Sequence, residues 1–527
     1  MRTPARLATA GAVAVLILVP ATAAGAAPDR PRPLRVSGPS PYAACTAGST
    51  PTSTLNPGAE VEPSVTTDAH RPGRIAGVWQ QDRWSDGGSH GIAAGFSSDG
   101  GRSFHEVTWP VSRCAPGGLP YDRASDPWVS TGPDGIMYGS ALNFDALTAR
   151  NGVAAITSYD GGRTWRNTTE VIADTEVAFG NDKNSVTADP ARPGRAYQVW
   201  DRLQSSPDGS KFITGPTFLS STRDGGRTWS APRIIVDTAP LQQTIGNVIV
   251  GDPRTGVLYN FYTSLLFTDP SGNDLVFDRF EMVRSVDGGR TWSRPTVVAQ
   301  DTGVNDVDPN DPTKVLRTSA GLAFPAIDPG TGELYLAYEG SDFTGGKYNQ
   351  IQLVHSTDRG RTWSAPVRVN GDPTTPAFTP SIAVDDRGDV GISYYDLRTL
   401  RAGNTTTLPT STWLTVSPRG GTRFGHERPV APVFDHLLAP FAGGLFLGDY
   451  EGLAAFDETF RAFFVTTNAG PPGNPTDVFF RQLRAFDRDA DRDSAPASPE
   501  LTAPAAAASP ARPVLKLTAG ARGRSAR

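Results

Sequence analysis

Charged side chains gather at two kinds of position in this 527-residue chain, where short apolar runs begin and where the following runs end. The first positions hold Glu60, Glu62, Asp126, Asp182, Lys183, Asp449 and Tyr450. The second hold Asp82, Arg83, Asp201, Arg202, Glu339, Asp396 and Arg398. Carboxylates can transfer protons, tyrosine can act as a nucleophile, and guanidinium groups can hold a carboxylate. Brought together these groups would form a polar ligand site, although neighbouring Asp and Arg can equally form structural ion pairs.

The elements that position these groups are predicted to be β-strands. Short runs rich in β-branched and aromatic residues come in pairs separated by Gly, Pro or Asp turns, such as NSVTAD then RAYQVW, and SIAVDD then DVGISYY. No amphipathic helix of useful length stands out. If the first strand of each pair runs downward, its first residues and the last residues of the second strand lie at the same end.

A glycine-rich loop recurs after the third run of each group. Its copies are SSDGGRSF, SYDGGRTW, TRDGGRTW, SVDGGRTW and STDRGRTW, with Asp99, Asp160, Asp224, Asp287 and Asp358 in the third position. A degenerate copy, SPRGGTRF, carries Arg419 in that position. The Asp can accept hydrogen bonds from its own turn, Gly supplies a positive φ and Trp packs against a neighbour, so we interpret the loop as structural.

The loops recur every 61 to 71 residues, which suits one four-stranded propeller blade. Six groups carry a loop, and a seventh group of three runs lacks one. A strand from the N-terminal segment would complete that seventh group. The sequence therefore predicts an all-β propeller of four-stranded blades, with seven blades favoured and six as the alternative.

The motif S/T-x-D-x-G-x-T-W resembles the Asp box, or BNR repeat, of sialidase-like β-propellers, over residues 60–485. The resemblance implies a secreted glycoside hydrolase of the exo-alpha-sialidase type that acts on terminal sugars of glycoconjugates. Because Asp boxes also occur in binding proteins, a non-catalytic glycan- or protein-binding propeller is the alternative, and an enzyme of another class is a third possibility.

The resemblance also implies roles for single residues. Tyr450 in GDYEGL resembles the catalytic tyrosine of the family, with Asp182 or Glu451 as its acidic helper. Asp86 in QQDRWSDGG resembles the general acid/base.

Three arginines, Arg83, Arg202 and Arg398, would clamp a substrate carboxylate, and Asp126 would also bind substrate. The stretch in which the family places its first clamp arginine reads Val61-Glu62-Pro63 here. Glu60 and Glu62 would repel an anionic sugar.

The remaining segments frame the propeller. Residues 1–26 resemble a signal peptide, 27–58 form an N-terminal segment, 59–485 the propeller and 486–527 a disordered tail rich in Ala, Pro and Arg. Export favours a disulfide between the two cysteines, Cys45 and Cys114.

The composition limits the partners. A net charge of -5 argues against nucleic acid, and the apolar N-terminal run is too short to span a membrane. The Cys and His spacing does not resemble a zinc site. We expect an extracellular monomer that binds a glycan or glycoconjugate, without a cofactor or metal.

Overall fold

The computed structural model describes residues 32–486, except 273 and 471–472. The expected signal peptide and nearly all of the expected tail lie outside these residues. The described chain is all-β, as predicted, with short 3-10 helices at η1 (Asp342–Thr344) and η2 (His436–Leu438). None of its helices has the length and apolar character needed to cross a membrane.

The first half of the chain forms antiparallel meanders of four strands. The first contains β2 (Leu55–Thr67), β3 (Ile75–Trp84), β4 (Ser89–Ser97) and β5 (His105–Thr108). The next contains β6 (Arg123–Thr131), β7 (Met137–Phe144), β8 (Asn151–Ser158) and β9 (Arg166–Asp174). Then follow β10 (Phe179–Ala188), β11 (Ala196–Ser205), β13 (Thr217–Thr222) and β14 (Arg233–Val236), with β12 (Phe212–Thr214) beside β11. After them come β15 (Gln242–Gly251), β16 (Leu258–Phe267), β17 (Leu275–Ser285) and β18 (Thr296–Gln300).

The second half repeats the pattern. One meander contains β21 (Phe324–Ile327), β22 (Leu334–Gly340), β23 (Gln350–Ser356) and β24 (Val367–Arg368). Another contains β25 (Ala377–Val384), β26 (Val390–Asp396), β27 (Pro409–Ser417) and β28 (Glu427–Pro429), with β29 (Phe434–Asp435) beside β27. The last contains β31 (Gly452–Phe456), β32 (Thr459–Thr467) and β33 (Thr476–Arg484), and the N-terminal β1 (Leu34–Arg35) pairs with β33 as its fourth strand.

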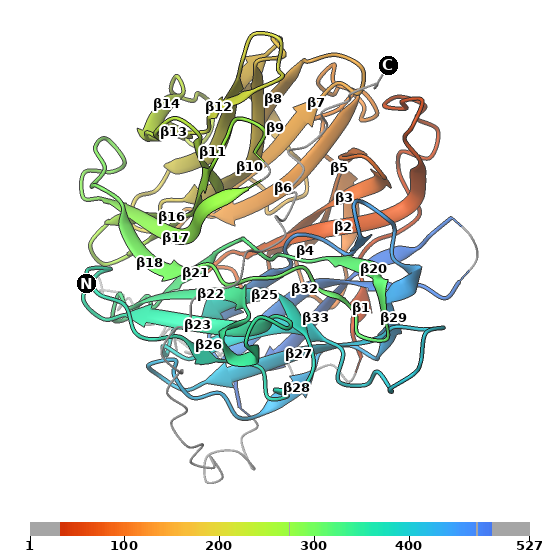
Figure 1. Cartoon of the computed structure of the whole chain (residues 1–527). Helices are drawn as coiled ribbons and strands as arrows, with labels where there is room; N and C mark the ends of the chain where they lie inside the picture. The colour runs from red at the N-terminus through yellow and green to blue at the C-terminus, as the bar shows by residue number, and fades with distance from the viewer. Residues whose placement is uncertain (1–31, 273, 471–472, 487–527) are drawn as a thin grey trace, which may run out of the picture.

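The meanders follow one another around a common centre, so the colour runs around the molecule in chain order (Figure 1). The first strand of each meander contacts the first strand of the next, and β31 contacts β2. Hydrogen bonds join the last meander to the first: the backbone N–H of Glu60 donates to Thr476 Oγ1 at 2.9 Å, and that of Val478 donates to Glu60 Oε2 at 3.1 Å. The first strands therefore line the centre.

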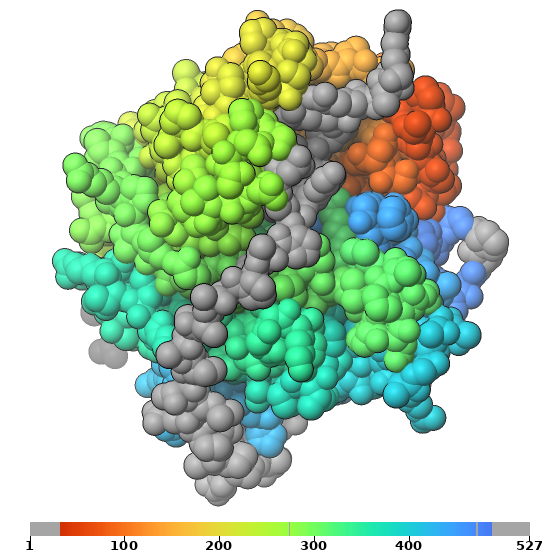
Figure 2. Space-filling model, viewed as in Figure 1, coloured from red at the N-terminus to blue at the C-terminus, as the bar shows by residue number. Residues whose placement is uncertain are grey.

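A small additional sheet crosses between distant parts of the chain. It contains β19 (Val307–Asp308), β20 (Asp311–Arg317) and β30 (Leu445–Phe446), and β20 pairs in parallel with β30. In the space-filling view, green residues near β20 lie against blue residues of the later segment (Figure 2). The segments that lead into β21 and β31 are thereby held together.

Five of the strands that line the centre, β2, β6, β10, β15 and β25, are bulged. Their register shifts at a residue with positive φ: Glu62 (54°), Asp126 (49°), Lys183 (46°), Gly246 (67°) and Thr379 (51°). A bulge inserts one extra residue and redirects its side chain. Positive φ is uncommon for residues other than glycine, so their surroundings must hold these conformations in place.

The five repeated loops share one hydrogen-bond pattern. In the loop of Asp287, Oδ1 accepts the backbone N–H groups of Arg290 and Thr291 at 3.0 Å, and Oδ2 accepts the Thr291 hydroxyl at 2.6 Å. The corresponding bonds from Thr362 lower the pKa of Asp358 to about 2. In the degenerate copy, the backbone N–H of Arg423 donates instead to the Ser417 hydroxyl at 3.0 Å, and that of Arg419 donates to Asp389 at 3.2 Å.

Replacing Asp160 by alanine is expected to lower the free energy of unfolding by about 1 to 2 kcal/mol. The carboxylate accepts the Thr164 backbone N–H at 2.9 Å, the Thr164 hydroxyl at 2.7 Å and the Ser158 hydroxyl at 2.9 Å, and alanine leaves these donors without it. Urea denaturation measures the change. Asp160→Asn keeps one carbonyl acceptor, so its free energy of unfolding should lie between those of wild type and the alanine variant. An alanine variant as stable as wild type would contradict a structural role.

Cys45 and Cys114, 69 positions apart in sequence, form a disulfide with Cα atoms 5.5 Å apart. It ties the N-terminal segment to the loop between β5 and β6. Replacing both cysteines by serine is expected to destabilise the protein by about 4 kcal/mol, since the unfolded chain regains the entropy of a long loop. Denaturation of the serine variant, compared with the disulfide-bonded wild type, checks this value, and the reduced wild type should match the variant.

Candidate active site

Lys183 lies at the centre of the described sheets, on the bulge of β10. Its Nζ is 2.6 Å from Asp449 Oδ2, 3.5 Å from Asp126 Oδ2 and 3.6 Å from Glu62 Oε1. These carboxylates come from β6, β2 and the residues before β31. Burial alone lowers the pKa of Lys183, but the carboxylates raise it well above its usual value, so the ammonium group stays charged.

Two arginines complete this group. Arg317, at the end of β20, forms a bidentate pair with Asp449, with distances of 2.9 and 2.6 Å. Arg83, at the end of β3, donates to Gln80, which in turn donates to Glu62. The guanidinium groups of Arg83 and Arg317 lie 5.1 and 4.4 Å from the ring centre of Phe446. We call Glu62, Arg83, Asp126, Lys183, Arg317 and Asp449 the central cluster.

The central cluster is buried and tightly coupled. Burial raises the pKa of Glu62, while Lys183 opposes this shift. Burial also raises the pKa of Asp449, but Arg317 and Lys183 lower it far more. Arg317 and Lys183 thus hold Asp449 as a carboxylate.

Tyr450 borders the central cluster. Its ring packs on Trp128 at 5.1 Å between centres, and Lys183 Nζ lies 6.0 Å from its ring centre. Its hydroxyl donates to the Pro127 carbonyl oxygen at 3.1 Å. Burial, followed by Glu62 and two further carboxylates, raises the pKa of Tyr450 well above 10. A nucleophilic role therefore requires a base to take the phenolic proton.

A cavity of about 30 Å³ opens beside Tyr450. Asp126, Lys183, Asn184 and Asn247 form its polar wall. Apolar side chains, including Trp128, Leu322 and Phe324, form the other wall. A space of this size admits water rather than a whole sugar ring.

Asp182 and Asp201 lie next to the central cluster. They pair directly across β10 and β11, and both are buried. Burial, and then Asp182, raises the pKa of Asp201 well above its usual value. Asp182 is therefore close to the centre, where its Oδ1 accepts the backbone N–H of Lys183 at 2.9 Å.

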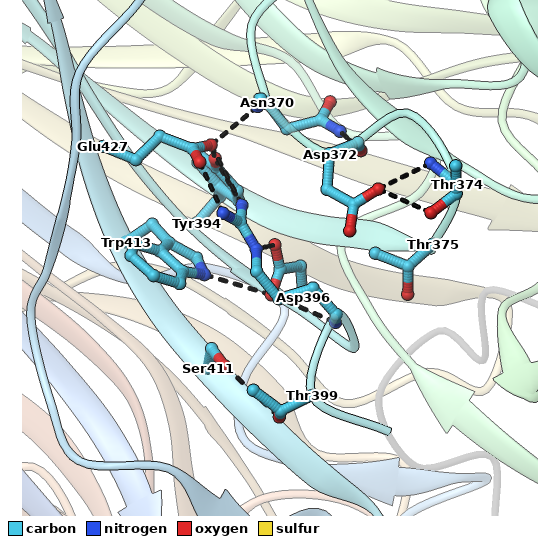
Figure 3. A network of polar contacts seen from close by, with 12 residues as sticks. Asn370, Asp372, Thr374, Thr375, Tyr394, Asp396, Thr399, Ser411, Trp413 and Glu427 are labelled. Atoms are coloured by element: carbon cyan, nitrogen blue, oxygen red, sulfur yellow. Dashed lines mark hydrogen bonds and ion pairs between the residues drawn. The ribbon is translucent and has the colours of Figure 1, made fainter. Parts of the chain in front are cut away.

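The other two clamp arginines are engaged with carboxylates outside the central cluster. Arg202 pairs with Asp174 at 2.9 and 2.6 Å and stacks on Phe179. Arg398 pairs with Asp396 and with Glu427, and its guanidinium lies 4.0 Å from the ring centre of Trp413 (Figure 3).

The Arg398 network extends to a neighbouring loop. Glu427 accepts a hydrogen bond from the Gly371 backbone N–H at 2.6 Å, and Trp413 Nε1 donates to Asp396 at 3.0 Å (Figure 3). Among the described residues, no ion pair links Arg202 or Arg398 to the central cluster. Of the expected clamp, only Arg83 lies in the central cluster.

Asp86 and Glu451 also have partners. Asp86 receives a hydrogen bond from Arg123 at 2.7 Å, and about a third of its side chain is exposed. Glu451 accepts the Tyr395 hydroxyl at 2.6 Å. Among the residues that the structure describes, no hydrogen bond joins either carboxylate to Tyr450.

The structure thus brings Tyr450, Arg83 and Asp126 together, with Asp182 beside them. Of the other members, Glu62, Lys183 and Asp449 are among the strand-start residues expected to converge on a polar site, but no catalytic or clamp role was predicted for them. Arg317 carries no sequence signal, because it reaches the centre only through the pairing of β20 with β30.

Known proteins resemble this chain only in part. No protein-family model matches it. A sialidase of Micromonospora viridifaciens is 27% identical over 225 residues, which cover 37% of this chain and 33% of that protein.

Among solved structures, a protein of unknown function from Dyadobacter fermentans has a TM-score of 0.44 and 13% identity, covering 82% of this chain and 100% of its own. A Hadza microbial sialidase has a TM-score of 0.43 and 15% identity, covering 78% and 76%. A Penicillium chrysogenum alpha-L-arabinanase, complexed with arabinobiose, has a TM-score of 0.41 and 14% identity, covering 69% of this chain and 95% of its own. The chain spans about a third of the length of the curated sialidase it matches.

Proposed function

We propose that this chain is a secreted glycoside hydrolase of the sialidase-like type, built as a seven-bladed Asp-box β-propeller, that releases terminal sugars from glycoconjugates. The observation that carries the proposal is the position of Tyr450, which meets Arg83, Asp126 and Lys183 at the centre. A tyrosine among carboxylates and fixed cations has the components of covalent glycoside cleavage.

In this proposal Tyr450 attacks the anomeric carbon, and a carboxylate takes the phenolic proton. Asp126 is the best placed base, because it lines the same cavity as Tyr450 and its Oδ2 has no hydrogen-bond partner among the described residues. Asp86, which is partly exposed, is the proposed acid that protonates the leaving sugar oxygen and later activates water.

The geometry supports the glycosidase class more strongly than sialic acid as the substrate. Lys183 and Arg317 are ion-paired with carboxylates of the chain itself, and the two other clamp arginines are paired elsewhere. Arg83 donates a hydrogen bond to Gln80. A substrate carboxylate would have to displace one of these partners. A neutral sugar needs no such exchange.

Release of 4-methylumbelliferone from a panel of aryl glycosides tests the proposal. The panel includes the sialic acid conjugate and neutral hexosides and pentosides. Turnover of any member supports the glycosidase, and the preferred member identifies the sugar.

A non-catalytic glycan-binding propeller is the second candidate. It is favoured by the small cavity and by the cover of β20 and β30 over the central cluster. Retention on a glycan array together with no turnover across the panel would favour this candidate.

A further inference from the structure

His90 of β4 lies beside the disulfide between Cys45 and Cys114. A ring nitrogen of the histidine and the two sulfur atoms all lie within 4.8 Å of one another. The histidine is only 2% exposed, whereas both cysteines are half-buried. The spacing of these residues in the sequence does not resemble a zinc site, and only the fold brings them together.

The orientation of His90 is fixed from two sides. Its Nδ1 lies 3.2 Å from Asp82 Oδ2, and its ring meets that of Trp84 edge-on with centres 5.4 Å apart. Asp82 is held in turn by the Ser40 hydroxyl at 2.6 Å and the Gly58 backbone N–H at 2.8 Å. Because a carboxylate accepts hydrogen bonds, this contact keeps a proton on Nδ1 and leaves the lone pair of Nε2 for a ligand.

The Nε2 atom of His90 has no comparable partner. It is buried without a hydrogen bond among the described residues. An unpaired polar nitrogen is costly to bury, so native proteins usually give it a hydrogen bond or a metal ion. Histidine ligands of zinc have this arrangement, in which one ring nitrogen binds the metal and the other donates to a carboxylate.

We propose that Cys45, Cys114 and His90 bind Zn²⁺ once the disulfide is reduced. A dithiol supplies the two electrons and two protons: the S–S bond breaks, two thiols form and the dithiol becomes a disulfide itself. Zn²⁺ then displaces the two thiol protons and binds two thiolates and Nε2 of the histidine. Two Cys and one His are a ligand set of zinc that leaves a fourth position open, and thiolate with imidazole favours zinc over Ca²⁺ or Mg²⁺. For the reduced chain, this proposal revises the expectation that the protein binds no metal.

The bound ion would take over the structural role of the disulfide. The disulfide ties the N-terminal segment to the loop between β5 and β6, and that segment also reaches Asp86. The Gly48 carbonyl oxygen accepts a hydrogen bond from Arg123 at 2.8 Å, and the Thr50 hydroxyl donates to Asp86 at 3.2 Å. With zinc bound, these contacts would keep their anchor under reducing conditions. The proposal does not depend on whether the protein is a glycosidase.

Thermal unfolding of the full mature chain in two redox states tests the site with zinc alone. One sample keeps its disulfide, and the other is reduced with dithiothreitol, which is then removed under anaerobic conditions. We expect a slight molar excess of ZnCl₂ to raise the Tm of the reduced sample by several degrees, because an ion that binds only the folded state stabilises it. The disulfide form should not respond, since its sulfur atoms are bonded to each other. Co²⁺ in place of Zn²⁺ should give a thiolate-to-metal charge-transfer band, which reports sulfur ligation directly.

His90→Gln is the decisive variant, because it removes the imidazole and keeps both cysteines. We expect it to weaken zinc binding by the reduced chain at least about 100-fold, measured by isothermal titration, and Asp82→Asn, which weakens the hold on the ring, to do so about 10-fold. His436→Gln is the matched control. His436 is similarly buried, with its Nδ1 3.4 Å from the Thr410 hydroxyl, but it lies outside the group formed with the cysteines. This control should bind zinc like wild type.

Three results would overturn the proposal. The first is a reduced chain whose Tm is indifferent to ZnCl₂ and which shows no heat of binding. The second is an equal rise in Tm for the disulfide form, which would place the ion elsewhere. The third is a His90→Gln chain that binds zinc like wild type, which would show that the histidine is not a ligand.

Two further measurements apply if a sample does not fold. If the reduced wild type is unfolded without zinc, circular dichroism follows the titration, and zinc must restore the fold. If His90→Gln does not fold, Asp82→Asn replaces it, and unchanged zinc binding by that variant counts against the proposal.

Discussion

Replacing Tyr450 by phenylalanine is expected to lower kcat/KM for the preferred aryl glycoside by about 10³-fold or more, because the reaction loses its nucleophile. The ring should keep its packing on Trp128, and the fold should lose only the hydrogen bond to the Pro127 carbonyl. That bond contributes about 1 kcal/mol to stability. Activity and Tm are measured on the same preparation, so that a catalytic loss is separated from unfolding.

Tyr348→Phe is the matched control. Its hydroxyl also donates to a prolyl carbonyl oxygen, that of Pro373, at 3.0 Å, but it lies outside the central cluster. This variant should keep wild-type kcat/KM while losing a similar hydrogen bond. A Tyr450→Phe enzyme with more than about a tenth of wild-type activity would show that another group is the nucleophile.

Replacing Lys183 by methionine is expected to lower the free energy of unfolding by about 3 to 5 kcal/mol, because three buried carboxylates lose their shared cation. The loss should be smaller at pH 5 than at pH 8. Carboxylates without a cation have raised pKa values in the folded state, so protonation at low pH relieves their repulsion. Urea denaturation at both pH values measures the difference.

Two further variants separate the ion cluster from general effects of losing a lysine. Lys314→Met removes a partly exposed lysine that lies 3.5 and 3.8 Å from Asp311 and Asp308, and it should cost less than about 1 kcal/mol. The double variant Lys183→Met, Asp449→Asn should recover part of the loss, since it also removes one carboxylate. Equal losses from Lys183→Met and Lys314→Met would contradict a cluster held together by Lys183.

The recurring loop and the strands around it could be read from the sequence because their causes are local. Asp287 bonds to residues three and four positions further on, so its role is contained within one turn. The runs of β-branched and aromatic residues between turn residues likewise predict strands from local sequence. The all-β class is confirmed for these reasons.

The composition of the central cluster could not be read in the same way. Arg202 and Arg398 stand at the ends of second strands just as Arg83 does, yet only Arg83 faces Glu62 and Phe446. Arg202 is held by Asp174 from the preceding meander, and Arg398 by Glu427. The positions of strand ends are sequence properties, but the direction of each side chain depends on which partner is nearest.

The sequence by itself determined the strand-forming runs, their grouping in fours and the repeated turns, because neighbouring residues decide these features. Only the tertiary structure decided which charges meet. Asp449 and Arg317, 132 positions apart, form an ion pair because β20 and β30 lie side by side. Lys183 and Asp449, which also form an ion pair, are 266 positions apart in the sequence. Bulges with positive φ at Glu62, Asp126 and Lys183 turn these side chains toward the centre, and packing of the first strands against one another holds those bulges in place.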